Sequence, residues 1–160
     1  FDNIVAFWNP AKPIEAGQEL LYSYNMYWGS QPPVQSNRAR VVDTFTGIGG
    51  VIGKKRDYYS KRFVVDFAGG SLAMLGKETE VNAVITTSDG KIEIESARPL
   101  RSIDGYRAMF DLVPPSGESK PINLRVYLEA NGQPLTETWQ YQWTSPEEGD
   151  RELHNAGHLK

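Results

Sequence analysis

The feature of this sequence that most limits its fold is an alternation of apolar and polar residues with a period of two. The longest example runs from Glu19 to Trp28, and one of its faces carries Leu20, Tyr22, Tyr24, Met26 and Trp28. Successive side chains of a β-strand point to opposite faces, and aromatic residues are enriched in strands. The segment therefore predicts a long, half-buried strand.

The same pattern predicts further strands along the chain. The strong candidates are Arg62–Phe67, Val81–Thr87, Lys91–Ala97, Tyr106–Leu112, Ile122–Leu128 and Leu135–Trp143, with Arg38–Phe45 as a weaker one. Ser88-Asp89-Gly90 predicts a tight hairpin turn between two of them. Gly70–Leu75 indicates a short helix with Ser71 as its cap. About seven or eight strands with regular turns predict an all-β fold, an immunoglobulin-like antiparallel β-sandwich.

The amino-acid composition argues against several classes of protein. The chain has 160 residues, 17 Lys and Arg, 20 Asp and Glu, a net charge of −3 and no cysteine. The lack of cysteine excludes disulfides, thiolate nucleophiles and Cys-zinc sites. The mild negative charge argues against a nucleic-acid partner, which would require a basic face. The apolar runs fall short of the ~20 residues that a membrane-spanning helix needs.

The segment boundaries follow from where the alternation begins and ends. We expect a junction segment over 1–12, an immunoglobulin-like domain over 13–145 and a polar tail or short terminal helix over 146–160. Asn3–Trp8 is apolar on both faces, which is typical of a strand packed between two bodies. The chain begins at Phe1 without a methionine, so we expect a processed product or an excised piece of a longer protein.

The glycine-rich stretch Gly47–Lys55 has the glycine density of a phosphate-binding loop. A Walker loop requires glycine where Ile48 stands and Ser or Thr where Lys55 stands, so the spacing fails twice. We interpret the stretch as a loop between two strands.

A basic and aromatic cluster follows this loop. Arg56, Tyr58 and Tyr59 lie among several lysines. Aromatic faces pack against the C–H surfaces of sugars while polar side chains bind hydroxyl groups, so these three residues are candidate carbohydrate-binding residues. The alternative is a solvated loop whose tyrosines fold back onto the sandwich.

Carboxylates are the remaining candidates for catalysis, because glycoside hydrolysis requires two of them flanking the scissile bond. The candidates are Asp2, Asp43, Asp57, Asp66 and Asp111. Asp66 and Asp111 lie within predicted strands, where we expect them to point to solvent. Asp2 precedes an apolar strand, and its alternative role is that of a turn or strand cap. His154 and His158 lack a third ligand, so no metal or other cofactor is expected.

Several strings of residues resemble one known family. They are Asp2–Trp8, Tyr22–Gly29, Phe63–Gly70 and Leu135–Trp143. Together they resemble the C-terminal part of the periplasmic glucans biosynthesis proteins (MdoG/MdoD, also OpgG/OpgD), from Asp2 to about Trp143. Ile48–Gly53 and the pair Tyr27-Trp28 look closer to the D type than to the G type.

The resemblance implies a periplasmic location and a glucan partner with a β-1,2-linked backbone. Family members carry a large N-terminal β-sandwich with a glucan cleft, followed by a smaller immunoglobulin-like domain, which this chain matches. The family has been associated with cleavage of β-1,2-glucan, as in a glycoside hydrolase. Asp2 is the residue that matches an acidic position near the domain junction, and the resemblance makes it a candidate general acid. A lone acid leaves this fragment inactive by itself.

These inferences favour an accessory module that supports the cleft of the N-terminal domain, its intramolecular partner. Two alternatives remain open. The chain is an independent carbohydrate-binding module, or it is a protein–protein adaptor that uses the basic loop Lys54–Arg62.

Overall fold

The computed structural model describes residues 9–30, 33–34, 36–76, 78–117 and 119–151. The chain divides into two compact units, Phe1–Gln35 and Ser36–Lys160, called unit 1 and unit 2 below. The predicted immunoglobulin-like domain begins at residue 13, whereas the first strand of the described chain begins at Arg40, in unit 2. The apolar segment Asn3–Trp8 lies outside the described residues.

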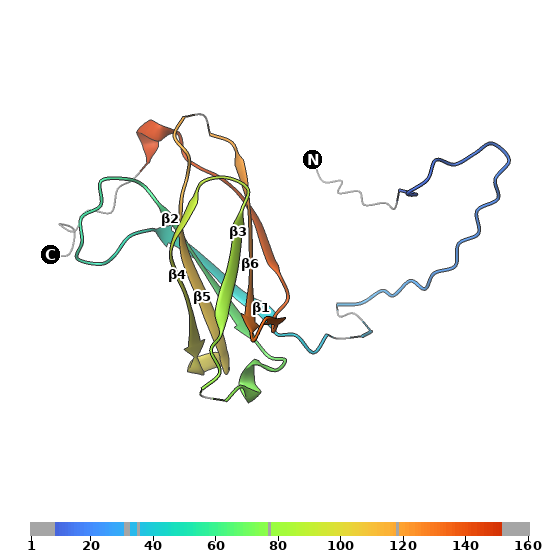
Figure 1. Ribbon diagram of the computed structural model, residues 1–160, viewed down its shortest axis with the longest axis horizontal. Coiled ribbons are helices and arrows are strands. Elements are labelled where there is room, and N and C mark those ends of the chain that lie inside the picture. The colour runs from blue at the N-terminus through green and yellow to red at the C-terminus, as the bar shows by residue number, and fades with distance from the viewer. Residues whose placement is uncertain (1–8, 31–32, 35, 77, 118, 152–160) are drawn as a thin grey trace. The chain divides into compact units, whose positions relative to one another are not determined.

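The described part of unit 2 is built from strands and three 3-10 helices (Figure 1). The strands are β1 (Arg40–Ile48), β2 (Lys61–Ala68), β3 (Asn82–Thr87), β4 (Lys91–Leu100), β5 (Gly105–Val113), β6 (Pro121–Ala130), β7 (Gln133–Pro134) and β8 (Trp139–Thr144). The 3-10 helices are η1 (Leu72–Met74), η2 (Arg101–Ile103) and η3 (Glu148–Asp150). The fold class is therefore all-β, as the alternation predicts.

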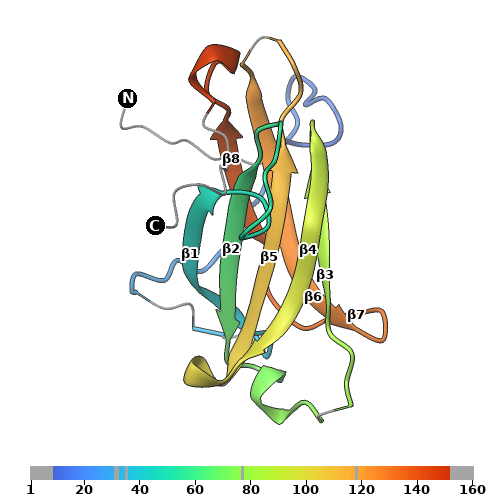
Figure 2. The same ribbon diagram turned by 90° about the vertical axis from the view of Figure 1, so that its left-hand side faces the viewer.

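The strands form two antiparallel sheets. One sheet has the order β1-β2-β5-β4, and Figure 2 shows these strands side by side. In the other sheet β6 pairs with β3, β7 and β8. This is the strand arrangement of a constant-type immunoglobulin sandwich, in which four strands face three and the interrupted strand β7–β8 forms one edge. The predicted immunoglobulin-like sandwich is confirmed.

The predicted hairpin at Ser88-Asp89-Gly90 is wrong. The strand before it, β3, pairs with β6, and the strand after it, β4, pairs with β5 in the other sheet. The turn therefore carries the chain from one sheet to the other. A Gly-containing turn between two alternating segments looks the same in sequence whether the strands pair with each other or cross the core.

The predicted strand Leu135–Trp143 is also interrupted. The Ala39 N–H donates to Leu135 O at 2.9 Å, and the Glu137 N–H donates to Ala39 O at 2.9 Å. The Glu137 carboxylate then accepts from the Val41 N–H at 2.8 Å. The residues at the start of β1 thus bind the second sheet, between β7 and β8, and hold the two sheets together at this end.

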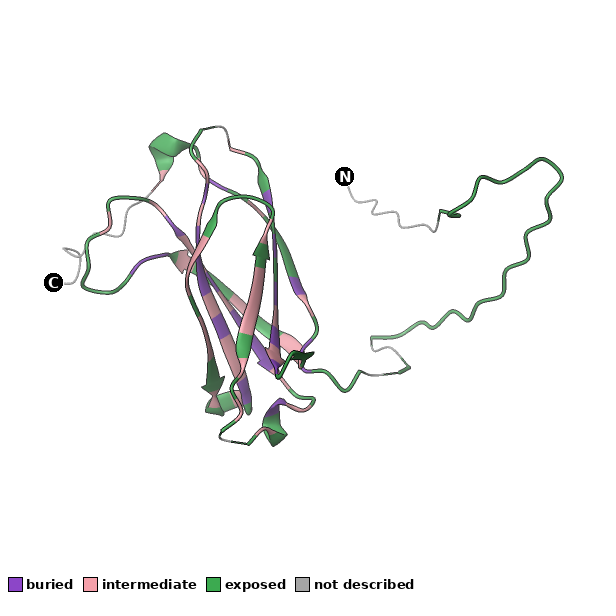
Figure 3. Cartoon of the chain, in the orientation of Figure 1, coloured by how far each residue is buried: buried purple, intermediate pink, exposed green. Residues whose placement is uncertain are grey.

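The core lies between the two sheets, and the buried side chains of β6 alternate with exposed or half-buried ones along the strand (Figure 3). Phe63 of β2 and Phe110 of β5 stack with ring centroids 5.4 Å apart. Trp139 of β8 lies 6.1 Å from Phe63, and its indole N–H donates to Thr44 Oγ1 at 3.0 Å. These aromatic contacts join the sheets in a chain that has no cysteine for the disulfide found in antibody domains.

Two local predictions differ from the structure. Glu19–Trp28 forms no strand, and its large apolar side chains are exposed, with Leu21 at 86% and Trp28 at 90% (Figure 3). A strand needs a partner for its backbone hydrogen bonds, and the described residues supply none to this segment. The short helix predicted at Gly70–Leu75 is the 3-10 helix η1, and its N-cap residue Ser71 makes no side-chain capping bond.

Candidate functional site

The candidate site is the loop Gly49–Ser60, which joins β1 to β2 at one end of the first sheet. Below it, Arg62 of β2 and Asp111 of β5 face each other in register. Arg62 Nε donates to Asp111 Oδ1 at 2.7 Å and Arg62 Nη2 donates to Oδ2 at 3.1 Å, so the pair is bidentate. The Asp111 side chain is fully buried. A buried carboxylate requires such a partner, because removing an unpaired charge from water costs several kcal/mol.

Two glycines of the loop, Gly49 and Gly50, lie against this carboxylate. The Gly50 N–H donates to Asp111 Oδ2 at 2.7 Å, and Arg62 Nη2 donates to Gly50 O at 2.6 Å. A Cβ on Gly49 would lie 2.8 Å from Asp111 Oδ2 and would collide with the Ser60 hydroxyl. Gly49 is therefore a glycine because the backbone there passes directly over a buried ion pair, whereas Gly53 adopts a positive φ of 80° in open space. Both observations agree with the interpretation of this stretch as an inter-strand loop.

Arg56 fixes the second half of the loop. Its Nη1 donates to Ser60 Oγ at 2.7 Å and lies 3.7 Å from Asp111 Oδ2 and 3.8 Å from Glu93 Oε2. Its side chain is only 12% exposed. The guanidinium carbon also lies 4.7 Å from the centroid of the Tyr58 ring, which is a cation–π arrangement. Arg56 thus links the buried charge to the loop surface.

Tyr58 is held against β4. Its hydroxyl donates to Glu93 Oε2 at 2.8 Å, and Lys91 Nζ lies 2.9 Å from Glu93 Oε1. The hydrogen bond to Glu93, followed by desolvation, raises the pKa of Tyr58 above its ordinary value. The hydrogen bond from Lys91, followed by that from Tyr58, lowers the pKa of Glu93. Around neutral pH the contact therefore joins a protonated tyrosine to an ionised carboxylate.

The surface of the loop has two hollows. One, of about 300 Å³, is lined by Val51, Lys54, Lys55, Arg56, Asp57 and Tyr58. The other, of about 320 Å³, is lined by Asp57, Tyr58, Tyr59, Pro114, Ser116, Glu148 and Arg151. Tyr58, 46% exposed, lines both hollows. A half-exposed aromatic ring that lines two hollows beside charged side chains is suited to contact with a sugar ring.

The structure brings together the three predicted carbohydrate-binding residues Arg56, Tyr58 and Tyr59. Tyr58 and Tyr59 line the hollows, while Arg56 is mostly committed to the ion network. Whether any of them binds sugar stays a prediction. Asp2, the candidate general acid, lies outside the described residues, as do His154 and His158.

The expectation that Asp66 and Asp111 point freely to solvent is wrong. Asp66 is 4% exposed and binds Arg107 with two contacts of 2.7 Å, and Asp111 is paired as described above. Their neighbours Phe67 and Phe110 face the core, so both carboxylates are on the outer face of the sheet, as alternation requires. They are buried there because arginines from neighbouring strands cover them, and strand order does not follow from local sequence.

Sequence analysis named Arg62 in the basic loop and Asp111 among the carboxylates, but it missed their pairing with each other and the contribution of Glu93 to the site. Arg62 and Asp111 belong to different strands, and their pairing appears only when β2 lies next to β5.

The described residues contain no cluster of His, Cys, Asp and Glu that would hold a metal ion. In the same part of the chain, no helix is long and apolar enough to cross a membrane. The loop Gly49–Ser60 can position aromatic and polar side chains for binding. The buried carboxylates Asp66 and Asp111 are each paired with an arginine.

The fold and this loop define an immunoglobulin-like β-sandwich module with a basic and aromatic loop at one end. The family model described as "Periplasmic glucan biosynthesis protein, MdoG" matches residues 1–143, and the chain belongs to this family.

Curated relatives agree with this assignment. The chain is 76% identical over all of its 160 residues to a protein of Shewanella oneidensis named "Probable glucans biosynthesis protein D". It is 56% identical over 156 residues to "Glucans biosynthesis protein D" of Xanthomonas axonopodis and 57% identical over 149 residues to the protein of that name in Stenotrophomonas maltophilia. These matches cover 100%, 96% and 93% of this chain but 30%, 29% and 28% of the relatives. The chain therefore spans about a third of the length of the relatives that it matches.

The packing of Gly49 leads to a stability prediction with a matched control. Gly49→Ala lowers the free energy of unfolding by about 1–3 kcal/mol, because its Cβ meets Ser60 and Asp111. Gly47→Ala, two residues earlier, has no atom within 4 Å of its Cβ and leaves the stability unchanged or raises it by up to about 1 kcal/mol. Urea unfolding followed by tryptophan fluorescence measures both. Equal stability of the two variants would contradict this account of the loop.

The contacts of Glu93 lead to a prediction about its pKa. Lys91→Gln raises the pKa of Glu93 toward its ordinary value by more than Tyr58→Phe does, because the Lys91 contact is the larger cause of the lowering. The contacts stabilise the fold above the ordinary pKa of glutamate and are lost as pH falls through the lowered pKa. Carbon-detected NMR titration of the Glu93 carboxyl group measures the shift, with Lys54→Gln as a control that leaves it unchanged. A larger shift in Tyr58→Phe would contradict the order of causes.

Proposed function

We propose that this chain is the C-terminal immunoglobulin-like module of a periplasmic protein of glucan biosynthesis or processing. It supports a glucan cleft formed by an upstream N-terminal β-sandwich domain, and its glucan has a β-1,2-linked backbone. Family membership and the short span relative to the curated relatives support a module within a larger protein.

The observation that carries the proposal is the state of the buried carboxylates. Asp66 and Asp111 are each bound bidentately by an arginine. A glycosidase needs two carboxyl groups that face the scissile bond, whereas both oxygens of Asp66 and of Asp111 are held by an arginine of a neighbouring strand. These two residues therefore serve structure, and the module acts by binding and support.

The exposed segment of unit 1 is consistent with this role. Tyr22, Tyr24 and Trp28, which share one face of the alternating pattern, expose 75–90% of their surface. Soluble proteins rarely leave such a contiguous apolar surface uncovered, so a surface of the larger protein is expected to bury it.

We assign the acid of the parent protein to Asp2, near the domain junction, where it would protonate the leaving oxygen of the cleaved bond. Asp2→Asn in the full-length protein lowers cleavage of linear β-1,2-glucan by at least about 100-fold, within the usual range for loss of acid catalysis. Chromatography of the glucan products measures this. Unchanged cleavage in a folded variant would remove Asp2 from the mechanism.

A second candidate function is that of an independent carbohydrate-binding module, favoured by the two hollows that Tyr58 lines. Tyr58 presents one ring face to Arg56, and its exposed remainder is open to a ligand. In this case the isolated chain would bind glucan through the loop without any upstream domain.

The two tyrosines provide the test of sugar contact by the loop. In the full-length protein, Tyr58→Ala with Tyr59→Ala weakens binding of linear β-1,2-glucan about tenfold, because two aromatic contacts are lost. Isothermal titration calorimetry measures the affinity, and thermal unfolding checks that the variant is folded. Tyr127→Ala, on the polar side of β6 in the other sheet, is the control and leaves the affinity unchanged.

The same titration with the isolated chain separates the two candidate functions. Loop-dependent binding by the isolated chain as tight as by the full-length protein would favour the independent module. Unchanged affinity in the folded double variant of the full-length protein would contradict sugar contact by this loop.

A further inference from the structure

The edges of the first sheet are protected against pairing with a further strand. The register of the edge strand β1 shifts between Val41 and Asp43. The register of the other edge strand, β4, shifts between Glu93 and Ser96, where Ile94 has a positive φ of 53°. Such bulges bend an edge strand and interrupt its row of free backbone groups, which is a common way to prevent edge-to-edge association.

The edge strand β8 of the second sheet lacks these features. Its six residues, Trp139–Thr144, pair with β6 in an unbroken register and include no charged residue and no proline. Ala39 binds Leu135 and Glu137 just before β8, but within the described chain no strand pairs with the free side of β8 itself. A regular, uncharged edge of this kind is open to pairing with another strand.

The backbone groups of Gln140 and Gln142 face this free edge. Asn123 of β6 lies opposite Gln142, but its N–H donates to Ser88 Oγ at 2.9 Å and its carbonyl accepts from the Ser88 N–H at 3.0 Å. Opposite residues of antiparallel strands alternate between hydrogen-bonded and non-hydrogen-bonded pairs. Asn123 and Gln142 therefore form a non-hydrogen-bonded pair, so the N–H and C=O of Gln142 point outward, and those of Gln140 do the same.

The sequence of this edge reads the same in both directions. Residues 139–143 are Trp-Gln-Tyr-Gln-Trp, which is symmetric about Tyr141. If two such strands pair in antiparallel fashion about Tyr141, each Gln140 lies opposite a Gln142. Each Trp139 then lies opposite a Trp143. Two copies related by a twofold axis present the same surface to each other, so their interface has to be self-complementary in this way.

The direction of the backbone groups agrees with pairing about Tyr141. Gln140 of one copy and Gln142 of the other would form a hydrogen-bonded pair, and each of the two such pairs exchanges two N–H···O bonds. Tyr141 falls in a non-hydrogen-bonded pair, in which side chains approach most closely, and its side chain is 42% exposed. A shift by one residue would instead place Gln140 opposite Tyr141, whose backbone groups face β6.

We propose that β8 is a self-association edge through which two copies of this chain pair as antiparallel strands about Tyr141. The second sheets of the two copies then form one continuous sheet. The proposal is independent of the proposed function, because no sugar or other ligand takes part in the contact. Since the strand is short, the interface is small, and we expect a weak dimer that depends on concentration.

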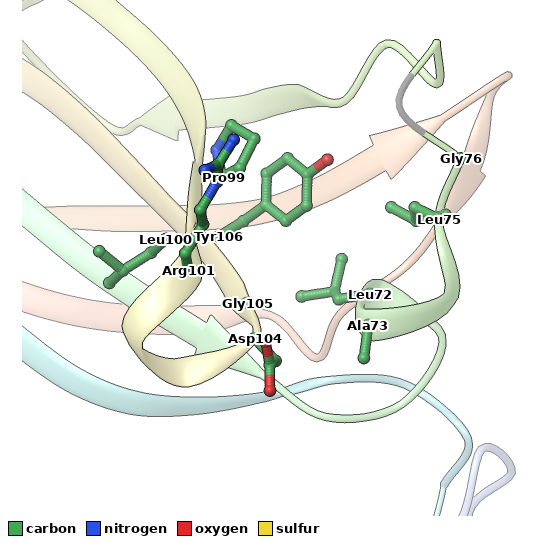
Figure 4. A pocket seen from close by; sticks show the side chains of 10 residues that line it. All are labelled: Leu72, Ala73, Leu75, Gly76, Pro99, Leu100, Arg101, Asp104, Gly105 and Tyr106. Carbon is green, nitrogen blue, oxygen red and sulfur yellow. The ribbon is translucent and has the colours of Figure 1, made fainter.

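Two other surfaces of the described chain provide controls. The strand β3 is the opposite edge of the same sheet, and its sequence, Asn-Ala-Val-Ile-Thr-Thr, has no such symmetry. A cavity of about 640 Å³ between η1 and η2 has apolar walls that include Leu72, Leu75 and Tyr106 (Figure 4). Either surface could receive a second copy in a different way, so both are tested beside β8.

The test is sedimentation velocity of the 160-residue chain from about 5 µM to about 1 mM, a range that covers weak dimers. We expect the weight-average mass to rise with concentration toward that of a dimer. Gln140→Lys with Gln142→Lys places lysine opposite lysine twice and weakens association at least about tenfold. Thermal unfolding checks that the variant is folded, and both substituted side chains are exposed.

A charge exchange tests the register of the pair. Gln140→Glu with Gln142→Glu weakens self-association to a similar extent. An equimolar mixture of the lysine and glutamate variants forms a heterodimer at least as strong as the unmodified dimer, because each lysine then faces a glutamate.

The controls add the same charge elsewhere. Asn82→Lys with Thr86→Lys changes exposed positions of β3, and Ala73→Lys with Met74→Lys changes exposed positions of η1 beside the cavity. Both are expected to leave association unchanged, and an equal loss in either one would overturn the proposal.

Three further results would also overturn it. They are a monomer at every concentration, a mixture that forms no heterodimer, and a lysine variant of β8 that associates as strongly as the unmodified chain. The last result would arise if the exposed segment Glu19–Trp28 joined the copies.

Discussion

The candidate site depends on one buried ion pair, Arg62 with Asp111, on the outer face of the first sheet. A buried carboxylate is stable only when it is paired and hydrogen-bonded, which here requires both the arginine and the Gly50 N–H. That hydrogen bond brings the loop backbone so close that a Cβ on residue 49 would collide with the Ser60 and Asp111 side chains. The course of the loop toward Arg56 and the tyrosines then follows from this contact, and so does the position of the two surface hollows.

A second ion pair between β2 and β5 lies on the same outer face of the sheet. Asp66 and Arg107 form a second bidentate pair, and the Arg107 guanidinium lies 5.6 Å from the centroid of the half-exposed Phe45 ring. The sheet is thus joined on its core side by the aromatic contacts of Phe63 and Phe110 and on its outer side by ion pairs between β2 and β5. The loop Gly49–Ser60 therefore joins two strands that are linked to their neighbours on both faces of the sheet.

Much of the fold could be predicted from the sequence, because the alternation reports directly which face of a strand is buried. Segments such as Arg62–Phe67 and Ile122–Leu128 became β2 and β6. Alternation does not show which strands pair with each other, and this explains why one strand and one hairpin were wrongly predicted. Glu19–Trp28 has the pattern of a strand but no partner in the described chain, and Ser88–Gly90 connects strands of different sheets. The pairing of Asp111 with Arg62 could not be predicted either, because it depends on β2 lying next to β5. The aromatic part of the site could be predicted because Tyr58 and Tyr59 lie close to Arg56 in the sequence.

We propose that unit 2 supports glucan binding by a longer protein of the periplasmic glucan biosynthesis family. The most direct measurement is the calorimetric affinity of linear β-1,2-glucan for the full-length protein and for a version that ends at Gln35 of this chain. The account predicts that removal of unit 2 weakens binding at least tenfold although the remaining protein stays folded by circular dichroism. Unchanged affinity without unit 2 would contradict the account.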